Sequence, residues 1–216
     1  MTDVKAKENP PAATAVLAAP ASGADHVMAK DAEARRAEII AAAHELYGEK
    51  GLAQTSIKDI TERVGVTRSL FYHYFPNKEA VTSAVLDSYA DDFVEALHYW
   101  NADRHEGDIN HALSTVVRLL RLGLFENDAF RTDLASRENA ALYLEFVNRV
   151  AEQTSEYIIE STVQDYAARH EVRIEHLHET FYILILGVIG YLRKHPDADD
   201  QVIADVIAQT LHMDRP

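Results

Sequence analysis

Cysteine is absent from all 216 residues of this chain. Its absence excludes disulfide frameworks, zinc fingers built on thiolates and catalysis by a thiol. Long apolar runs are lacking too, because the longest near-continuous one, Phe181 to Leu192, has twelve residues. A helix needs about 20 apolar residues to span a bilayer. We therefore expect a protein with no membrane partner.

The N-terminus lacks the features of a secretory signal peptide. Such a peptide begins with basic residues and continues into a strong apolar core. Here Asp3, Glu8, Pro10 and Pro11 interrupt an alanine-rich patch. Residues 1–29 show no periodicity and are rich in Ala and Pro, which predicts a disordered tail. With no signal peptide and no cysteine, we expect a cytoplasmic location.

Signatures of catalysis are missing as well. The chain has no glycine loop that would cradle phosphate, no nucleophile elbow and no Ser/His/Asp arrangement. A helical di-metal site needs two Glu-x-x-His pairs. One pair exists, Glu175 with His178, beside His170 and His176, and the spacing of Asp108 and His111 is a weaker echo. We predict no catalytic residue, no metal and no cofactor, with a helical-bundle metal enzyme as the alternative.

The negative charge is unevenly distributed. The net charge is -14, but residues 30–80 hold eight basic and eight acidic side chains, whereas residues 81–216 carry a net -13. A neutral segment still binds DNA when its basic groups face phosphate and its acidic groups point away. The charge pattern therefore argues against non-specific coating of DNA and is compatible with specific binding by residues 30–80.

Helical periodicity runs from Asp31 onward, with no alternating strand pattern of useful length. We predict an all-α fold with an N-terminal three-helix domain at 30–80 and a larger helical domain at 81–216. The boundary falls inside a helix that begins at Lys78. Beyond residue 78 the predicted helices occupy 78–99, 108–122, 126–133, 136–169, 172–194 and 198–213.

The stretch from Thr55 to Ala80 predicts a helix-turn-helix. Thr55 and Ser56 offer N-cap oxygens, Gly65 tolerates a positive φ at the turn, and Thr67 begins the second helix. Hydrophobic Phe71 would face inward, leaving the outer side chains to reach base edges and phosphates. Arg68 is placed for a bidentate contact to guanine. The predicted DNA contacts are Thr55, Lys58, Thr67, Arg68, Ser69, Tyr72, His73, Tyr74 and Lys78.

Ordered residues within this stretch resemble the N-terminal region of TetR-type bacterial transcription regulators. The shared elements are Thr55, Gly65-Val66, the run Phe71-Tyr72-His73-Tyr74-Phe75, and Lys78-Glu79, within residues 35–85. The resemblance implies phosphate contacts by Tyr72 and Lys78, with residues 67–69 and His73 facing the bases. Leu70 departs from the pattern, since many such proteins have Thr there, and it is suited to a thymine methyl.

The TetR resemblance implies that the acidic helical remainder dimerises and holds a small ligand. A stripe with 4-3-4-3 spacing and a second apolar helix would form a four-helix dimer interface. The predicted interface residues are Leu177, Phe181, Leu184, Val188, Tyr191, Val202 and Val206. A ligand site combines apolar walls with a few polar groups. The candidate ligand residues are Trp100, Arg121, Tyr143, Phe146 and Tyr182.

The sequence thus predicts a homodimeric, ligand-responsive DNA-binding regulator. It would bind a palindromic operator in double-stranded DNA, because two recognition helices related by a two-fold axis read two half-sites. An unknown apolar or aromatic effector would release it. Repression is the default implied by the resemblance, and activation is the other possibility. A regulator controlled by a protein partner instead of a ligand is a further alternative.

Overall fold

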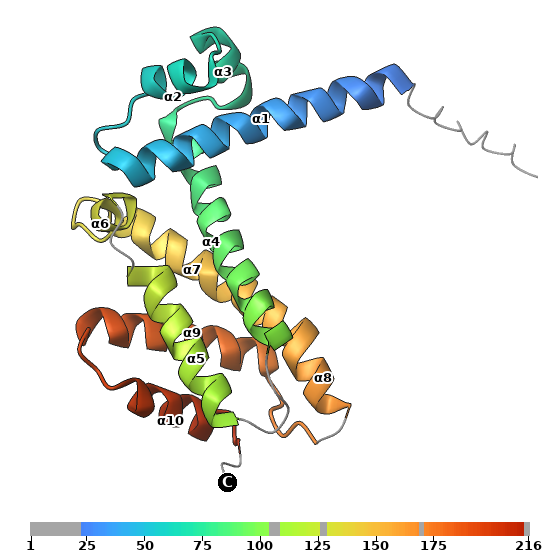
Figure 1. The fold of residues 1–216 in the computed structure, drawn as a ribbon, viewed down its shortest axis with the longest axis vertical. Helices are drawn as coiled ribbons and strands as arrows, with labels where there is room; N and C mark the ends of the chain where they lie inside the picture. Colours follow the sequence, from blue (N-terminus) through green and yellow to red (C-terminus); the bar gives the residue numbers. More distant parts are fainter. Residues whose placement is uncertain (1–22, 104–108, 126–128, 169–170, 214–216) are drawn as a thin grey trace, which may run out of the picture. The chain divides into compact units, whose positions relative to one another are not determined.

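A computed structural model describes residues 23–103, 109–125, 129–168 and 171–213, and every regular element among them is helical. Figure 1 shows the helices in chain order. Their bounds are α1 Gly23–Lys50, α2 Ile57–Val64, α3 Arg68–Tyr74, α4 Lys78–Asp103, α5 Ile109–Phe125, α6 Ala129–Leu134, α7 Ala140–Ile158, the π-helical η1 Ile159–Val163, α8 Gln164–Ala167, α9 Leu177–Lys194 and α10 Asp200–Thr210.

Helix α1 begins earlier than predicted. The predicted tail ended at residue 29, but α1 starts at Gly23, while residues 1–22 lie outside the described part. Beyond Pro20 the chain has Ala24, Met28 and Ala29, which are good helix formers. By contacts among Cα atoms the chain divides into residues 1–35 and residues 36–216, so α1 contributes to both units.

The unit of residues 36–216 has one continuous hydrophobic core. Its buried side chains run from Ile39 in α1 to Ala208 in α10. Helix α7 packs against α4 and against α9, and α10 packs against α5. Helix α4 crosses the domain boundary predicted near residue 80, and core residues lie on both sides of that position. Division into 30–80 and 81–216 therefore stays a prediction.

Two of the long predicted helices are shorter than expected. The helix predicted at 136–169 begins only at Ala140, after a turn, and the one predicted at 172–194 begins at Leu177. Before Leu177, exposed Arg173 and Glu175 alternate with half-buried Val172 and Ile174. This period of two is typical of extended chain, in which successive side chains point to opposite sides. The prediction of a helix over residues 172–176 is therefore wrong.

None of the described helices has the length and apolar character needed to cross a membrane.

Candidate DNA-binding surface and ligand cavity

Local hydrogen bonds fix the start of α2. Ser56 is the N-cap, and its hydroxyl oxygen accepts from the backbone N–H of Asp59 at 3.2 Å. The Asp59 carboxylate in turn accepts from the backbone N–H of Ser56 at 2.7 Å. This reciprocal capping box satisfies two N–H groups that a helix start leaves without partners. The Ser56 hydroxyl also donates to the Asp59 carboxylate at 2.6 Å. This hydrogen bond, the one from the Ser56 N–H and Lys50 at 3.1 Å hold the pKa of Asp59 well below its usual range.

The turn between α2 and α3 depends on Gly65. This residue has φ 75°, in the left-handed region that glycine adopts without steric cost. The N–H groups of Gly65 and Val66 both donate to the carbonyl of Thr61 at 3.0 Å. Thr67 then caps α3 by accepting from the N–H of Leu70 at 3.2 Å. The turn predicted from the sequence is therefore present at the predicted residues.

Helix α3 has a buried and an exposed side. Phe71 and Phe75 are buried and their rings lie 5.8 Å apart. The predicted DNA contacts in α3 and at its N-cap are exposed, except Tyr74, which is half-buried. The exposed ones are Thr67, Arg68, Ser69, Tyr72 and His73. Leu70 is exposed beside them. The phenylalanines anchor the helix, and the polar side chains remain accessible.

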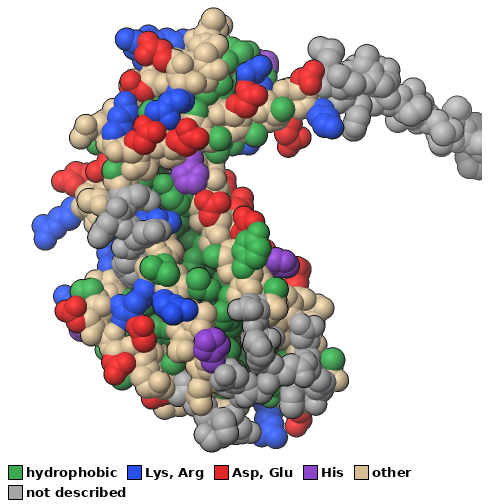
Figure 2. Space-filling model, viewed as in Figure 1, with side chains coloured by type: hydrophobic (Ala, Val, Ile, Leu, Met, Phe, Trp, Pro, Cys, Tyr) green, Lys and Arg blue, Asp and Glu red, His purple; other side chains and the backbone are tan. Residues whose placement is uncertain are grey.

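Two arginines near α3 have different surroundings. Arg63 donates to Glu45 at 3.1 Å and to Glu49 at 2.8 Å, which ties α2 to α1. Arg68 is exposed and forms no ion pair with any residue that the structure describes. Figure 2 shows basic and acidic side chains interspersed over this part of the molecule. The guanidinium of Arg68 is therefore accessible, whereas that of Arg63 is held by two glutamates.

Thr55 corrects one prediction. Its side chain is only 2% exposed, and its hydroxyl donates to the carbonyl of Gly51 at 2.8 Å. A buried hydroxyl with an internal acceptor stabilises the loop before α2 and does not reach a phosphate. The sequence offered both Thr55 and Ser56 as N-cap residues, and the N-cap of α2 is the exposed Ser56.

The two predicted lysine contacts already have partners within the protein. Lys78 is half-buried, its ammonium donates to the carbonyl of Leu52 at 2.6 Å, and burial lowers its pKa. Lys58 is exposed and lies 3.5 Å from Glu62. An exposed ion pair of this kind contributes little to stability, so Lys58 is readily released to another anion. Lys78 holds the start of α4 against the loop before α2.

A contact from α6 reaches the same loop. The Asp133 carboxylate accepts from the backbone N–H of Ala53 at 3.1 Å. Gly51 has φ 86°, and a Cβ atom there would lie 2.5 Å from an oxygen of Asp133. The positive φ and this close approach both favour glycine at position 51. Asp133 thus links the helices that follow α4 to the DNA-binding segment.

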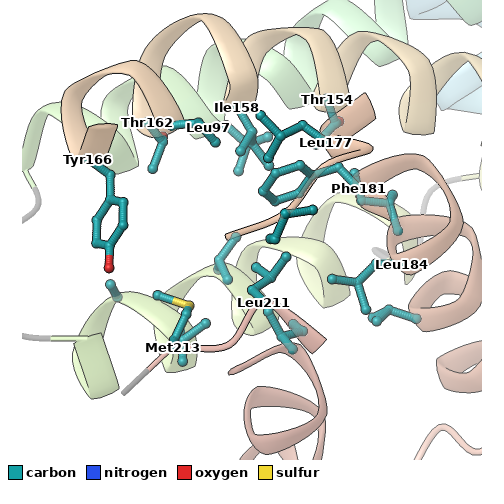
Figure 3. Close-up of a pocket in the computed structure, with 18 of the residues that line it drawn as sticks. Leu97, Thr154, Ile158, Thr162, Tyr166, Leu177, Phe181, Leu184, Leu211 and Met213 are labelled. Atoms are coloured by element: carbon teal, nitrogen blue, oxygen red, sulfur yellow. The ribbon is translucent and has the colours of Figure 1, made fainter. Parts of the chain in front are cut away.

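A cavity of about 350 Å³ lies among α4, α5, α7, η1, α8, α9 and α10. Figure 3 shows its labelled side chains around an open centre, with Tyr166 and Met213 facing Phe181 and Leu184. Its walls are mainly apolar, and α4 contributes Phe93, Leu97 and Trp100. The volume is at the lower end of the range of small-molecule pockets. A helix that follows directly after α3 therefore also forms part of the cavity wall.

Only one predicted ligand residue, Trp100, lines this cavity. Tyr143 and Phe146 instead border a separate cavity of about 110 Å³, where Arg193 lies 3.7 Å over the Tyr143 ring. Arg121 binds Asp200 and the carbonyls of residues 196 and 198, which fastens α10 to α5. The Tyr182 hydroxyl donates to Asn148 at 3.2 Å. Arg121 and Tyr182 line neither cavity, and their polar groups are bound to other parts of the fold.

The sequence prediction overlooked Thr154 on the wall of the larger cavity. Thr154 is 2% exposed, and its hydroxyl has no hydrogen-bond partner among the described residues. A buried polar group without a partner carries the full cost of losing water. The sequence feature that could have identified Thr154 is a threonine at a position where the periodicity of the helix predicts an apolar residue.

Helix α9 turns most of its predicted dimer stripe inward. Phe181 and Val188 are buried, and Leu177 and Leu184 are half-buried; all four line the cavity. Assigning these four residues to a dimer interface is therefore wrong for this structure, since they form an internal apolar side of α9. The remaining predicted residues are exposed: Tyr191 (47%), Val202 (50%) and Val206 (47%).

Exposed small and apolar residues remain on both α9 and α10, and we call them together the α9–α10 face. It consists of Ile183, Gly187, Gly190, Tyr191, Val202 and Val206. Ile183 is 68% exposed, and a Cβ atom added at either glycine would meet nothing within 4 Å. The sequence prediction did not include Ile183. This residue follows Phe181 by two positions, which places it on the opposite side of α9 from the predicted stripe.

The residues considered for a metal site are not gathered into one. His178 lies 3.1 Å from Glu152, and Glu175 is exposed. His170 and Asp108 lie outside the described residues. Within the described ranges, no group of three or more His, Asp or Glu side chains is arranged to hold an ion.

Residues 39–85 match the model of a protein family described as bacterial regulatory proteins, tetR family. The transcriptional regulator TtgR of Pseudomonas putida is 42% identical over 59 residues, which is 27% of this chain and 28% of TtgR. The sequence match thus spans little more than a quarter of that relative.

Solved structures match over a larger part of the chain. The resorcinol complex of RolR has a TM-score of 0.58 at 22% identity, covering 86% of this chain and 89% of RolR. The repressor AlkX of Dietzia sp. has a TM-score of 0.61 at 20% identity, covering 82% and 95%. These similarities confirm the all-helical fold with an N-terminal helix-turn-helix.

Proposed function

This chain belongs to the TetR family of bacterial regulatory proteins, and we propose that it regulates transcription by binding a palindromic operator as a homodimer. Regulators of this family are non-enzymatic transcription factors. The observation that carries the proposal is helix α3, where Phe71 and Phe75 are buried and Arg68, Tyr72 and His73 are exposed. This arrangement presents polar side chains on a short, rigidly anchored helix, as entry into the major groove requires.

Contacts to DNA divide into two kinds. Arg68, with Ser69 and His73, would reach base edges, and Arg68 would give bidentate hydrogen bonds to guanine. Tyr72, Lys58 and the N-terminus of α2 would hold phosphates and set the position of the protein on the duplex. The chain carries a net -14, so we expect the surrounding acidic surface to disfavour non-specific binding.

The α9–α10 face would form the dimer interface. Two copies related by a two-fold axis would pack their α9 and α10 helices together, and Gly187 and Gly190 would allow the helices to approach closely. Ile183, Val202 and Val206 would supply the apolar contacts. Dimerisation places two α3 helices to read two half-sites of a palindrome.

A small molecule in the larger cavity would control DNA binding. RolR has a similar fold and was solved with resorcinol bound. Here Phe93, Leu97 and Trp100 of α4 line the cavity, and the same helix begins at Lys78, which is bound to the loop before α2. A ligand that favours a different position of α4 would shift the population away from the DNA-binding form. We expect repression released by the ligand, in the cytoplasm.

Selection of binding sites from a random duplex pool by the purified protein tests the proposal. The expected product is an inverted repeat whose half-site centres lie about 10–10.5 base pairs apart, or a multiple of that spacing. Sedimentation of the protein with the selected duplex would then show an even number of chains per site. Enrichment of no sequence by folded protein would contradict the proposal.

A further inference from the structure

The larger cavity is built for an uncharged occupant. Glu171 and Arg173 are the oppositely charged residues on its wall, both are exposed, and they lie 3.5 Å from each other. His212, which also lines the cavity, is exposed as well. The other walls are contributed by apolar and neutral polar side chains. An ion in the interior would lose its hydration without a counter-charge, which is strongly unfavourable.

Most polar groups on the cavity wall are already engaged. The Trp100 indole N–H donates to the carbonyl of Ala112 at 3.2 Å, and the Thr162 hydroxyl donates to Asn101 at 3.2 Å. Thr154 differs, because its buried hydroxyl has no partner among the described residues. A hydroxyl both donates and accepts. A ligand with one hydroxyl or carbonyl group would therefore satisfy it.

We propose that the cavity binds a neutral, largely apolar molecule with a single hydroxyl or carbonyl group that hydrogen-bonds to Thr154. A volume of about 350 Å³ equals the space of about a dozen water molecules. The occupant therefore has on the order of a dozen non-hydrogen atoms. This inference rests on the proposed function, in which the same cavity is the regulatory site.

Titration of the full-length protein with decanol tests the chemistry of the ligand. Trp100 is the only tryptophan of the chain and lines the cavity, so its fluorescence reports occupancy directly. Decanoate and decylammonium serve as charged molecules of the same chain length. We expect saturable binding of decanol, and binding of both ions at least about tenfold weaker. Equal affinity for either ion, or no binding of decanol, would overturn the proposal.

The Thr154→Val variant tests the recognition point. Valine keeps the shape of threonine and removes the hydroxyl, so decanol should bind about three- to tenfold more weakly. Without ligand the variant should melt at the same temperature as the wild type or higher, because a buried group without a partner is lost. If the Thr154 hydroxyl instead stabilised the fold, Thr154→Val would melt at a lower temperature than the wild type. Unchanged decanol affinity would overturn the role of Thr154.

Ser155→Ala is the matched control. Ser155 is the next residue of α7, fully buried, and its hydroxyl donates to the carbonyl of Ala151 at 2.6 Å. It does not line the cavity, so this variant should bind decanol with wild-type affinity.

Binding of decanol to the protein on its selected duplex separates this inference from the proposed function. Decanol that binds without releasing DNA would support the cavity chemistry and contradict ligand control. Selective DNA binding with no affinity for decanol would support the DNA-binding role and overturn the inferred ligand class.

Discussion

The helix-turn-helix and the region around the cavity differ in where they place the side chains proposed for function. Around α2 and α3, short helices are fixed by caps and by a glycine turn, and the side chains proposed for function point outward. Around the cavity, long helices enclose apolar walls, and the side chains proposed for function point inward. In the first region function depends on which residues are anchored beneath the surface. In the second it depends on which volume the helices leave unfilled.

The largest expected effect is the loss of the anchor under α3. Phe71→Ala removes a fully buried ring and should lower the free energy of unfolding by about 3–5 kcal/mol. Chemical denaturation of the variant measures this. Tyr72→Phe is the control, since Tyr72 is exposed on the same helix and its ring is retained. Similar losses in the two variants would mean that α3 has no distinct inner side.

Ile183→Glu tests the α9–α10 face. A two-fold axis brings the same face of both copies together, so each interface would contain two added carboxylates. We expect the dimer to dissociate at least about a hundredfold more readily, or about 2.7 kcal/mol. Sedimentation equilibrium measures the change. Leu144→Glu, at an exposed apolar residue of α7, is the control. A dimer weakened only by Leu144→Glu would move the interface away from α9 and α10.

Gly51→Ala and Gly65→Ala compare two glycines with positive φ, one in the loop before α2 and one in the turn after it. Both variants force alanine into a positive φ, which costs about 1–2 kcal/mol. Only position 51 also brings a Cβ against Asp133, so Gly51→Ala should destabilise the protein more. Adding Asp133→Ala to each variant should reduce this difference. Thermal melting of the four proteins decides, and a difference that persists would show that Asp133 is not its cause.

The smallest expected effect concerns pH. The folded-state pKa of Asp59 is depressed by hydrogen bonds from Ser56 and by Lys50. A depressed carboxyl pKa stabilises the fold above the unfolded value of about 3.9, and this stabilisation is lost as pH falls through and below that value. Asp59→Asn should therefore show a smaller loss of stability on acidification than the wild type. Urea midpoints at neutral and acidic pH measure it, and parallel losses would contradict the account.

The sequence predicts the first region better than the second. Gly65, Thr67 and Phe71 act through neighbours a few residues away, so their roles follow from local spacing. Thr55 was misassigned because its acceptor at Gly51 belongs to the preceding loop. The TetR resemblance also concerned this region alone.

The stripe of α9 shows why the second region was harder. Apolar residues at 177, 181, 184 and 188 predict a buried side of a helix, but not whether a partner subunit or a cavity covers it. The cavity is the space left between helices that are far apart in the sequence, and no local sequence pattern predicts that space. Arg121 was misassigned for the same reason, since its partners lie on a distant loop and α10.

The most direct test of the central claim is selection of duplex sites by the wild type, Arg68→Ala and Arg63→Ala in parallel. If α3 reads DNA through its exposed side, Arg68→Ala should relax one symmetric pair of base positions, a loss of about 1–3 kcal/mol of discrimination. Arg63, which is bound by Glu45 and Glu49, should leave the base preferences of the site unchanged when replaced. An Arg68→Ala protein that selects the wild-type repeat undiminished would contradict the assignment of α3 as the reading helix.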